Sequence, residues 1–206
     1  MRWLAFALAL AYPLLIFAGL HWLDARVLGV CTGAILIVRL AIQRQGVLPS
    51  RRALVLPALG FGAVLILLAT KSNDPRYLFL LPALINGVLL ATFAASLWQP
   101  MTFIESLARM QAKDLSPEEV AYCRAVTKTW CGFFVLNAAV IVWLAFAGTP
   151  GQWATYTGFV SYLLVGLLFS AEYVFRHYRF RRYLGAPLDP LLRKLFPPRE
   201  SSGGAK

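Results

Sequence analysis

Six long apolar stretches take up most of this chain, and they constrain its fold more than any other feature. Each is close to the roughly 20 residues that an α-helix needs to cross the hydrocarbon core of a bilayer. The stretches cover residues 3–23, 27–42, 53–70, 77–98, 130–147 and 153–175. The pattern predicts an all-α polytopic membrane protein, built as a bundle of about six transmembrane helices.

The composition agrees with a lipid environment. Charged residues make up 14% of the 206 residues, whereas a soluble domain carries about 25%. Little chain remains outside the six stretches for a separate soluble domain. We therefore predict one transmembrane helical domain over residues 1–182 and a basic cytoplasmic tail over residues 183–206, which is partly disordered. The first stretch is interpreted as a retained span, because no small-x-small cleavage site follows it.

The basic residues are sorted by loop. They concentrate in the second loop, the fourth loop and the tail, and the other loops hold only Arg26, Lys71 and Arg76. The positive-inside rule then predicts that both termini are cytoplasmic, and an even number of crossings agrees with this. The net charge of +11 is interpreted as a topology signal and as contact with anionic headgroups. No nucleic-acid recognition motif accompanies the charge, so nucleic acid is not a predicted partner.

The fourth loop has a structure of its own. Apolar residues recur at helical spacing within Met101–Gln111, and Glu105 lies four residues before Arg109, which favours an ion pair on one helix face. This segment is predicted to be an amphipathic helix at the cytoplasmic interface. Leu115–Val120 then carries a capping box and a proline suited to a first helical turn. The helix that begins there is predicted to run on into the fifth stretch, because no helix breaker occurs before Gly132.

Polar residues within the apolar stretches are candidates for function, because hydrocarbon makes them costly. Asn86 and Asn137 fall near the middle of the fourth and fifth stretches, where they can bond across the two helices, either as structural contacts or as part of a polar path. Glu172 lies near the cytoplasmic end of the last stretch, four residues before Arg176. Those two residues are predicted to form an ion pair, with ligand or proton handling by Glu172 as the alternative.

Small and aromatic residues suggest how the helices pack. A small residue at every fourth position of the fourth stretch predicts a central helix, with dimerisation as the alternative; the residues are Ala83, Gly87, Ala91 and Ala95. The second stretch carries Gly29-x-x-x-Gly33. Aromatic residues at the ends of the stretches predict an interfacial belt; they are Trp3, Trp22, Tyr77, Trp98, Trp130 and Trp153.

Charged and aromatic residues near the cytoplasmic ends are interpreted either as a solvated face or as the lining of one cytoplasmic mouth. The candidates are Arg39, Glu105, Arg109, Tyr122, Arg124, Lys128, Glu172 and Tyr173. A basic and aromatic mouth suits an amphipathic acid, an anionic lipid or an acidic acyl carrier protein.

No catalytic residue, metal site or cofactor is predicted. The chain has no His-Glu-x-x-His, Gly-x-Ser-x-Gly or phosphate-binding glycine motif. Its two histidines, His21 and His177, lie on opposite sides of the membrane in the predicted topology. Its three cysteines form no Cys-x-x-Cys pair and are interpreted as small apolar packing residues.

Motifs spread over about residues 82–182 carry a family resemblance. They are Asn86, Ser96, Ile104-Glu105-x-x-Ala108-Arg109, Leu115-Ser116-Pro117-Glu118-Glu119, Tyr122-Cys123-Arg124-x-Val126-Thr127, Trp130, Phe133-Phe134-x-x-Asn137, Tyr156-Thr157-Gly158, Ser161-Tyr162-Leu163-Leu164-x-Gly166 and Glu172-Tyr173. With them the chain resembles small polytopic bacterial inner-membrane proteins encoded in aryl polyene and xanthomonadin-type biosynthetic clusters. Some members carry a ketosynthase label. That enzyme is a large soluble protein with a catalytic set of one cysteine and two histidines, and the sequence of this chain indicates no such set.

The resemblance implies a multi-pass protein of the bacterial inner membrane. The expected function is that of an accessory protein, without an assigned enzymatic activity, which assists the synthesis or handover of polyene or fatty acyl intermediates at the cytoplasmic leaflet. Membrane lipids are the expected partners, together with acyl carrier protein or biosynthetic enzymes and a second copy of the chain. The alternatives are a small lipid or aryl polyene transporter or flippase, and a membrane enzyme in which Glu172 and Tyr173 form the site.

Overall fold

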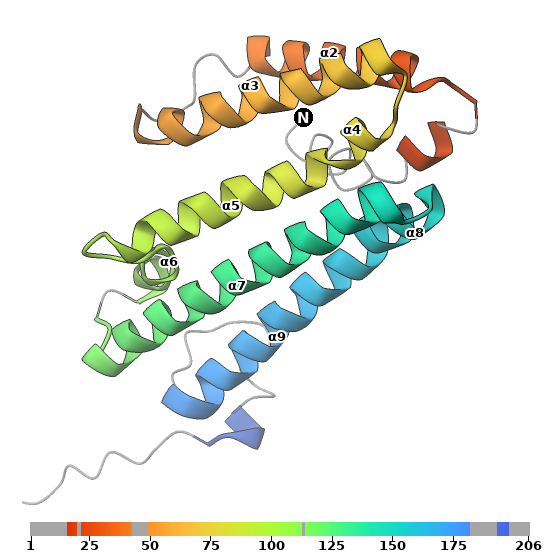
Figure 1. Ribbon diagram of the computed structural model, residues 1–206. Helices are drawn as coiled ribbons and strands as arrows, with labels where there is room; N and C mark the ends of the chain where they lie inside the picture. Colours follow the sequence, from red (N-terminus) through yellow and green to blue (C-terminus); the bar gives the residue numbers. More distant parts are fainter. Residues whose placement is uncertain (1–15, 20–21, 43–48, 113, 182–192, 198–206) are drawn as a thin grey trace, which may run out of the picture.

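A computed structural model describes residues 16–19, 22–42, 49–112, 114–181 and 193–197, and it places the side chains of these residues except 35–42 and 49–56 (Figure 1). Every regular element within this part of the chain is a helix, and it contains no strand. The labelled elements are α2 (Ala25–Ile42), α3 (Pro49–Ser72), α4 (Arg76–Phe79), α5 (Leu81–Leu97), α6 (Phe103–Gln111), α7 (Pro117–Ala147), α8 (Pro150–Thr155), a π-helix (Tyr156–Val160) and α9 (Ser161–Phe180). The predicted all-α fold class is confirmed.

Three helical stretches are long and apolar enough to cross a membrane. They are Arg76–Leu97, Pro117–Ala147 and Pro150–Phe180. The first matches the predicted fourth span to within one residue at each end, and the other two contain the predicted fifth and sixth spans. Shorter apolar helical stretches cover Ala25–Ala34 and Pro57–Ser72. Most of the predicted first span lies outside the described residues, so the count of six spans remains a prediction.

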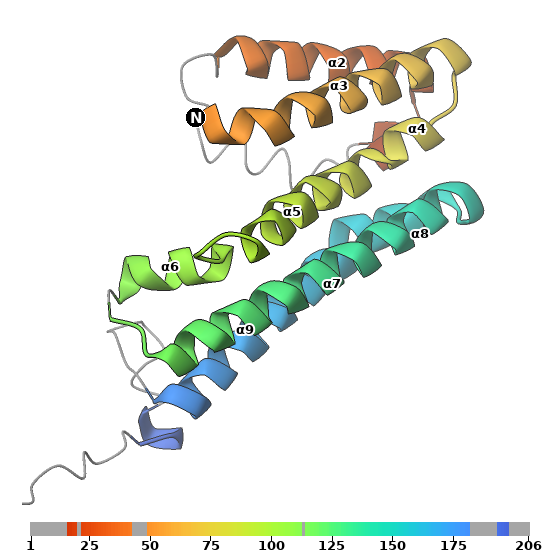
Figure 2. The same ribbon diagram turned by 60° about the vertical axis from the view of Figure 1, so that its left-hand side comes forward.

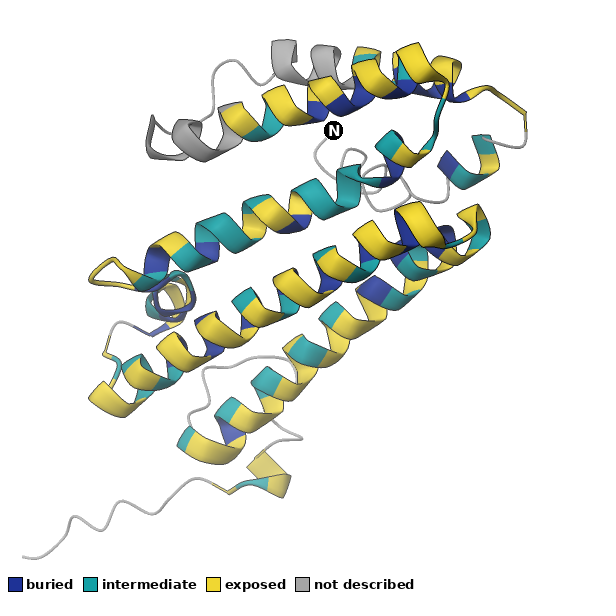
Figure 3. Cartoon of the chain, viewed as in Figure 1, coloured by how far each residue is buried: buried dark blue, intermediate teal, exposed yellow. Residues whose placement is uncertain are grey.

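The long helices lie side by side in chain order, each running back along the one before it (Figures 1 and 2). Helix α5 packs most extensively on α7 and also contacts α3, α4 and α6, so the predicted central position of the fourth span is confirmed. Helix α9 runs along α7 and is largely exposed (Figure 3). Helix α6 lies across the ends of α5 and α7, and in Figure 1 it is seen end-on.

The helix that was predicted over residues 77–98 is broken at Leu80 into α4 and α5. Pro82 stands in the first turn of α5, and it has no backbone N–H to donate to the carbonyl four residues earlier. Beside the break, the Phe79 carbonyl accepts a hydrogen bond of 3.1 Å from the indole N–H of Trp153. The break therefore exposes backbone polarity that α8 satisfies.

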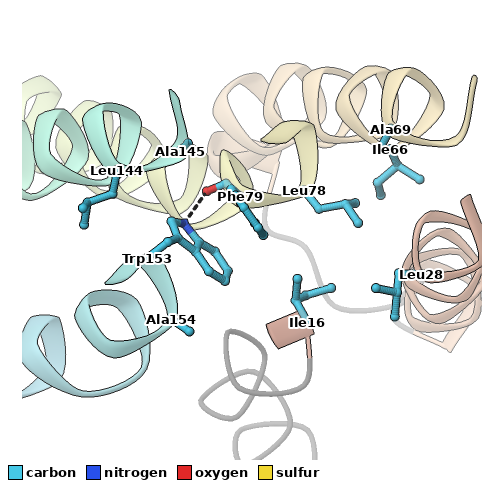
Figure 4. Close-up of a cluster of buried hydrophobic side chains, with 10 residues drawn as sticks. All are labelled: Ile16, Leu28, Ile66, Ala69, Leu78, Phe79, Leu144, Ala145, Trp153 and Ala154. Atoms are coloured by element: carbon cyan, nitrogen blue, oxygen red, sulfur yellow. Dashed lines mark hydrogen bonds between the residues drawn. The ribbon is translucent and has the colours of Figure 1, made fainter. Parts of the chain in front are cut away.

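Trp153 is the centre of a hydrophobic cluster that joins both halves of the fold (Figure 4). It is fully buried, and its ring stacks on that of Phe79 with 4.3 Å between centroids. Trp130 is buried as well, within an aromatic cluster between α5 and α7. Trp22 and Trp98 are exposed. The predicted aromatic belt is thus wrong for Trp130 and Trp153, because these two rings fill the space between helices.

Small residues do bring two helices close together, but on α2 rather than α5. A Cβ added to Gly29 would lie 2.6 Å from Oγ1 of Thr70, so α2 and α3 approach too closely there for a side chain. Gly87 on α5, in contrast, is exposed and has no atom within 4 Å of such a Cβ. Helix α5 buries Asn86 and Phe93 instead, so the predicted small-residue stripe does not form its main contact.

Local capping rules hold for the fourth loop. Helix α6 begins after Thr102, whose hydroxyl accepts a hydrogen bond from the backbone N–H of Glu105. Helix α7 begins after Ser116, and the predicted capping box with Glu119 is present. The helix then continues unbroken to Ala147, about 46 Å at 1.5 Å per residue. This length exceeds the hydrocarbon core of a bilayer by about 16 Å. The predicted continuation of this helix into the fifth stretch is confirmed.

Candidate functional site

Helix α6, the first turns of α7 and the last turns of α9 lie at one end of the helix array (Figure 1). Most of the predicted mouth residues are on these three segments. The side chain of Arg39 lies outside the described residues, although its backbone belongs to α2.

Glu105 is the most deeply buried charged residue of this end, at 4% exposed. Its Oε1 accepts hydrogen bonds from Nε and Nη2 of Arg109, at 2.9 and 2.8 Å. A buried carboxylate is costly unless it is paired and hydrogen-bonded, and the partly exposed Arg109 provides the pairing from one turn along the same helix. Helix α6 packs on α7, and the pairing with Arg109 allows the Glu105 carboxylate to remain buried in this packing.

A second carboxylate and guanidinium pair lies on α9. Oε1 of Glu172 accepts from Nε of Arg176 at 2.9 Å, and Nη2 of Arg176 lies 2.7 Å from the same oxygen, which confirms the predicted ion pair. Tyr122 of α7 packs against this pair: the Arg176 guanidinium lies 5.7 Å from the centre of its ring. The rings of Phe175 and Phe180 enclose Tyr122 further.

Cys123 lies on α7 near residues of both pairs. Its thiol is buried on α7 and lies within electrostatic reach of Glu105, Glu172 and Arg176. The sequence identified this cysteine only as a packing residue. The structure therefore brings Glu105, Arg109, Tyr122 and Glu172 around the first turns of α7, and Tyr173 follows on α9 with its ring 4.4 Å from that of His177.

Arg124 and Lys128 lie on a different face of α7. Two residues along an α-helix turn about 200°, so Arg124 points away from Tyr122. Nη1 of Arg124 donates to the carbonyl of Leu97 at 3.1 Å and thereby caps the end of α5. Lys128 is exposed one turn further along α7. The three predicted mouth residues on α7 thus fall on two faces of that helix: Tyr122 on one face, and Arg124 and Lys128 on the other. The prediction of one mouth is therefore wrong for Arg124 and Lys128, because residues two apart on a helix point in nearly opposite directions.

A separate polar network joins the three long apolar helices. Asn137 donates from Nδ2 to Oδ1 of Asn86 at 3.0 Å, so the predicted bond across α5 and α7 is confirmed. Asn86 in turn donates to the Pro82 carbonyl. Oδ1 of Asn137 accepts from the hydroxyls of Tyr156 at 2.8 Å and Ser161 at 3.1 Å.

The π-helix explains how one oxygen receives two donors from the same segment. In an α-helix, residues five apart point about 140° from each other. A π turn bonds residue i to residue i+5 and so places them on the same side; here the Ser161 backbone N–H bonds to the Tyr156 carbonyl. Tyr156 and Ser161 were not predicted from the sequence as members of this network. The sequence signal that could have identified them is a pair of hydroxyl-bearing residues, five positions apart, in the sixth apolar stretch.

No group of three or more potential metal ligands occurs among the described residues. Comparison with known proteins returned no matching family model, no matching curated protein and no matching solved structure. The geometry of the described residues is therefore the basis for a functional conclusion.

Proposed function

We propose that this chain is an accessory protein of the bacterial inner membrane that assists the handover of polyene or fatty acyl intermediates at the cytoplasmic leaflet. In this proposal the chain crosses the bilayer six times with both termini in the cytoplasm. Three helices long and apolar enough to cross a membrane support the placement, and the resemblance to proteins of aryl polyene clusters supports the substrate class.

The observation that carries the proposal is the charged end of the helix array, which consists of α6, the first turns of α7 and the last turns of α9. Helix α6 is held across the ends of α5 and α7 by its buried side chains Ile104 and Ala108 and by a hydrogen bond from the Phe103 N–H to the Ser96 hydroxyl. The buried Glu105, paired with Arg109 on the same helix, adds charge to this end. Beside it, Glu172, Arg176 and Tyr122 form a second charged and aromatic group. An amphipathic acyl cargo has an apolar chain and a polar end, and it needs both kinds of surface at the border of the hydrocarbon.

A thiol-labelling experiment tests the proposed topology. In a variant without Cys31, Cys123 and Cys131, we expect Ser72→Cys to react with a membrane-impermeant maleimide in intact cells. Gln111→Cys should react only after the inner membrane is permeabilised. Both positions are exposed. Ser72 is the last residue of α3 and Gln111 the last residue of α6, and these two helix ends lie at opposite ends of the helix array (Figure 1), so each variant serves as the control for the other. The reverse pattern would overturn the orientation and the role assigned to the charged end.

A deletion strain tests the function itself. Deleting the gene should cause carrier-bound acyl or polyene intermediates to accumulate, because the handover step is missing. Extraction of lipids and carrier proteins followed by mass spectrometry measures this. Complementation with the wild-type chain should restore the product, and unchanged intermediates and product in the deletion strain would refute the proposal.

The network of Asn86, Asn137, Tyr156 and Ser161 supports a second candidate, a small transporter or flippase. It places polar groups on all three long apolar helices, as a polar path would require. In that case the same deletion should trap finished product in the inner membrane. Normal export by a variant with Asn86, Asn137 and Glu172 replaced by apolar residues would remove this candidate.

A further inference from the structure

One exposed row of residues on α7 has cations at one end and apolar surface at the other, which is the order of the anionic headgroup and the acyl chain in a phospholipid. The row begins where α7 passes the end of α5 and advances four residues at a time, the spacing of neighbours on a helix surface. It consists of Arg124, Lys128, Gly132 and Leu136: two cations, a gap and an apolar side chain. Each step is about 6 Å along the helix axis.

Arg124 marks the polar end of this row. Its bond to the Leu97 carbonyl fixes the guanidinium at the level where α5 ends. That bond uses one of the five N–H donors of a guanidinium, and the side chain is exposed. The exposed Trp98 is the residue after Leu97, and an exposed tryptophan suits the headgroup level of a bilayer.

Lys128 lies one turn deeper along α7 than Arg124 if α7 crosses the bilayer from this end. It is exposed, and the described residues give it no hydrogen bond or ion pair. Side chains on a helix lean toward the helix N-terminus, so Lys128 leans back toward Arg124. A lysine stem can lie along apolar surface while its ammonium reaches the polar layer. The two cations can therefore meet one phosphate.

Gly132 leaves open surface below the cations. A Cβ added there would have no atom within 4 Å. Leu136, one further turn along, is 70% exposed and continues the row as apolar surface. This part of the row has room for an acyl chain against the helix backbone.

We propose that the row Arg124–Lys128–Gly132–Leu136 binds one anionic phospholipid of the cytoplasmic leaflet, with the phosphate between Arg124 and Lys128 and an acyl chain over Gly132. The proposal rests on the proposed placement of α7 across the bilayer. Arg124 and Lys128 are distinct from the charged and aromatic group of Glu172, Arg176 and Tyr122 that is proposed for acyl handover, because they lie on another face of α7. The occupant is a membrane lipid rather than a soluble phosphate, since the cations adjoin an apolar row.

Native mass spectrometry of the full chain, released from mixed micelles, tests this proposal. The wild-type chain should retain phosphatidylglycerol in preference to phosphatidylcholine. Lys128→Gln should weaken phosphatidylglycerol binding about fivefold, the effect of one cation at an anionic surface. Lys71→Gln, at the opposite end of the array, should leave binding unchanged. Gly132→Leu should reduce binding of the lipid, whereas Gly87→Leu, also exposed and open, should not.

Arg124 also caps α5, so Arg124→Gln is a poorer probe than Lys128→Gln, and the melting temperature of each variant identifies a folding defect. Equal retention of the two lipids by the wild-type chain would overturn the proposal. Unchanged binding in Lys128→Gln, or competition by inorganic phosphate alone, would do the same. Its failure is distinct from failure of the handover function, because lipid retention does not depend on the acyl intermediates that the deletion strain reports.

Discussion

Replacing Trp153 with alanine should lower the free energy of unfolding by about 3–5 kcal/mol, the usual cost of truncating a buried tryptophan. The side chain is fully buried and stacks on Phe79. Its indole N–H also satisfies the Phe79 carbonyl at the break between α4 and α5, and the variant leaves that group without its partner. Steric trapping in lipid bicelles measures the change.

Trp143→Ala is the matched control, because this tryptophan lies on α7 with its side chain 63% exposed. Its replacement should change the free energy of unfolding by about 0.5 kcal/mol or less. Trp153→Phe keeps most of the ring packing and removes the donor, so it should cost about 1 kcal/mol. If Trp153→Ala were no more harmful than Trp143→Ala, the docking of α8 against α4 would be wrong.

Features that depend on local spacing could be predicted from the sequence. The caps of α7 and the ion pairs Glu105–Arg109 and Glu172–Arg176 each involve residues three or four apart, and helix geometry alone brings such residues together. Asn86 and Asn137 were predicted from a different rule, because polar groups buried in apolar helices seek one another. The all-helical fold follows from the long apolar stretches.

Features that depend on how helices face each other could not be predicted in the same way. Trp153 lies near a helix start, which is where an interfacial tryptophan would also be found. Its burial depends on α4, whose Phe79 carbonyl accepts the indole N–H, and this contact cannot be read from the local sequence. The mouth residues Tyr122 and Arg124 differ from this case, because they are two positions apart and the geometry of the predicted helix already separates their directions. Only the neighbours that each side chain meets depend on which helices flank α7. No local sequence rule predicts the π turn at Tyr156–Val160. The turn aligns the hydroxyls of Tyr156 and Ser161, and this alignment matters only because Asn137 of α7 lies opposite them.

The polar network and the π turn depend on each other, and this interdependence has an energetic consequence. Tyr156 and Ser161 reach one oxygen only because the π turn aligns them, and the π turn in turn loses its polar partner if that oxygen is removed. A network whose members are all bonded stabilises one arrangement, whereas a partly satisfied one is costly in a low dielectric. Asn137 therefore contributes to the register of α9 against α7, together with the ring contacts of Trp130 with Phe169 and of Tyr122 with Phe175.

Asn137→Leu should lower the free energy of unfolding by about 2–3 kcal/mol. The substitution keeps the side-chain size similar and removes the three hydrogen bonds to Asn86, Tyr156 and Ser161, which in membranes are worth about 0.6 kcal/mol each on average and up to about 1.7. The same steric-trap measurement reports the loss. Faster amide hydrogen exchange over Tyr156–Ser161 should accompany it, because the π turn no longer has a partner.

Single hydroxyl deletions distinguish this network from general packing. Tyr156→Phe should lower the free energy of unfolding by about 1 kcal/mol. Ser161→Ala should lower it less, because a helical serine that loses its bond to Asn137 can bond a backbone carbonyl of its own helix instead, so the bond to Asn137 contributes little net stability. Ser170→Ala is the control, since that hydroxyl is exposed and already bonds the Gly166 carbonyl within α9; it should be neutral. If Tyr156→Phe cost as much in the Asn137→Leu background as in the wild-type chain, the two residues would be energetically independent, and the coupling between the π turn and α7 would be refuted.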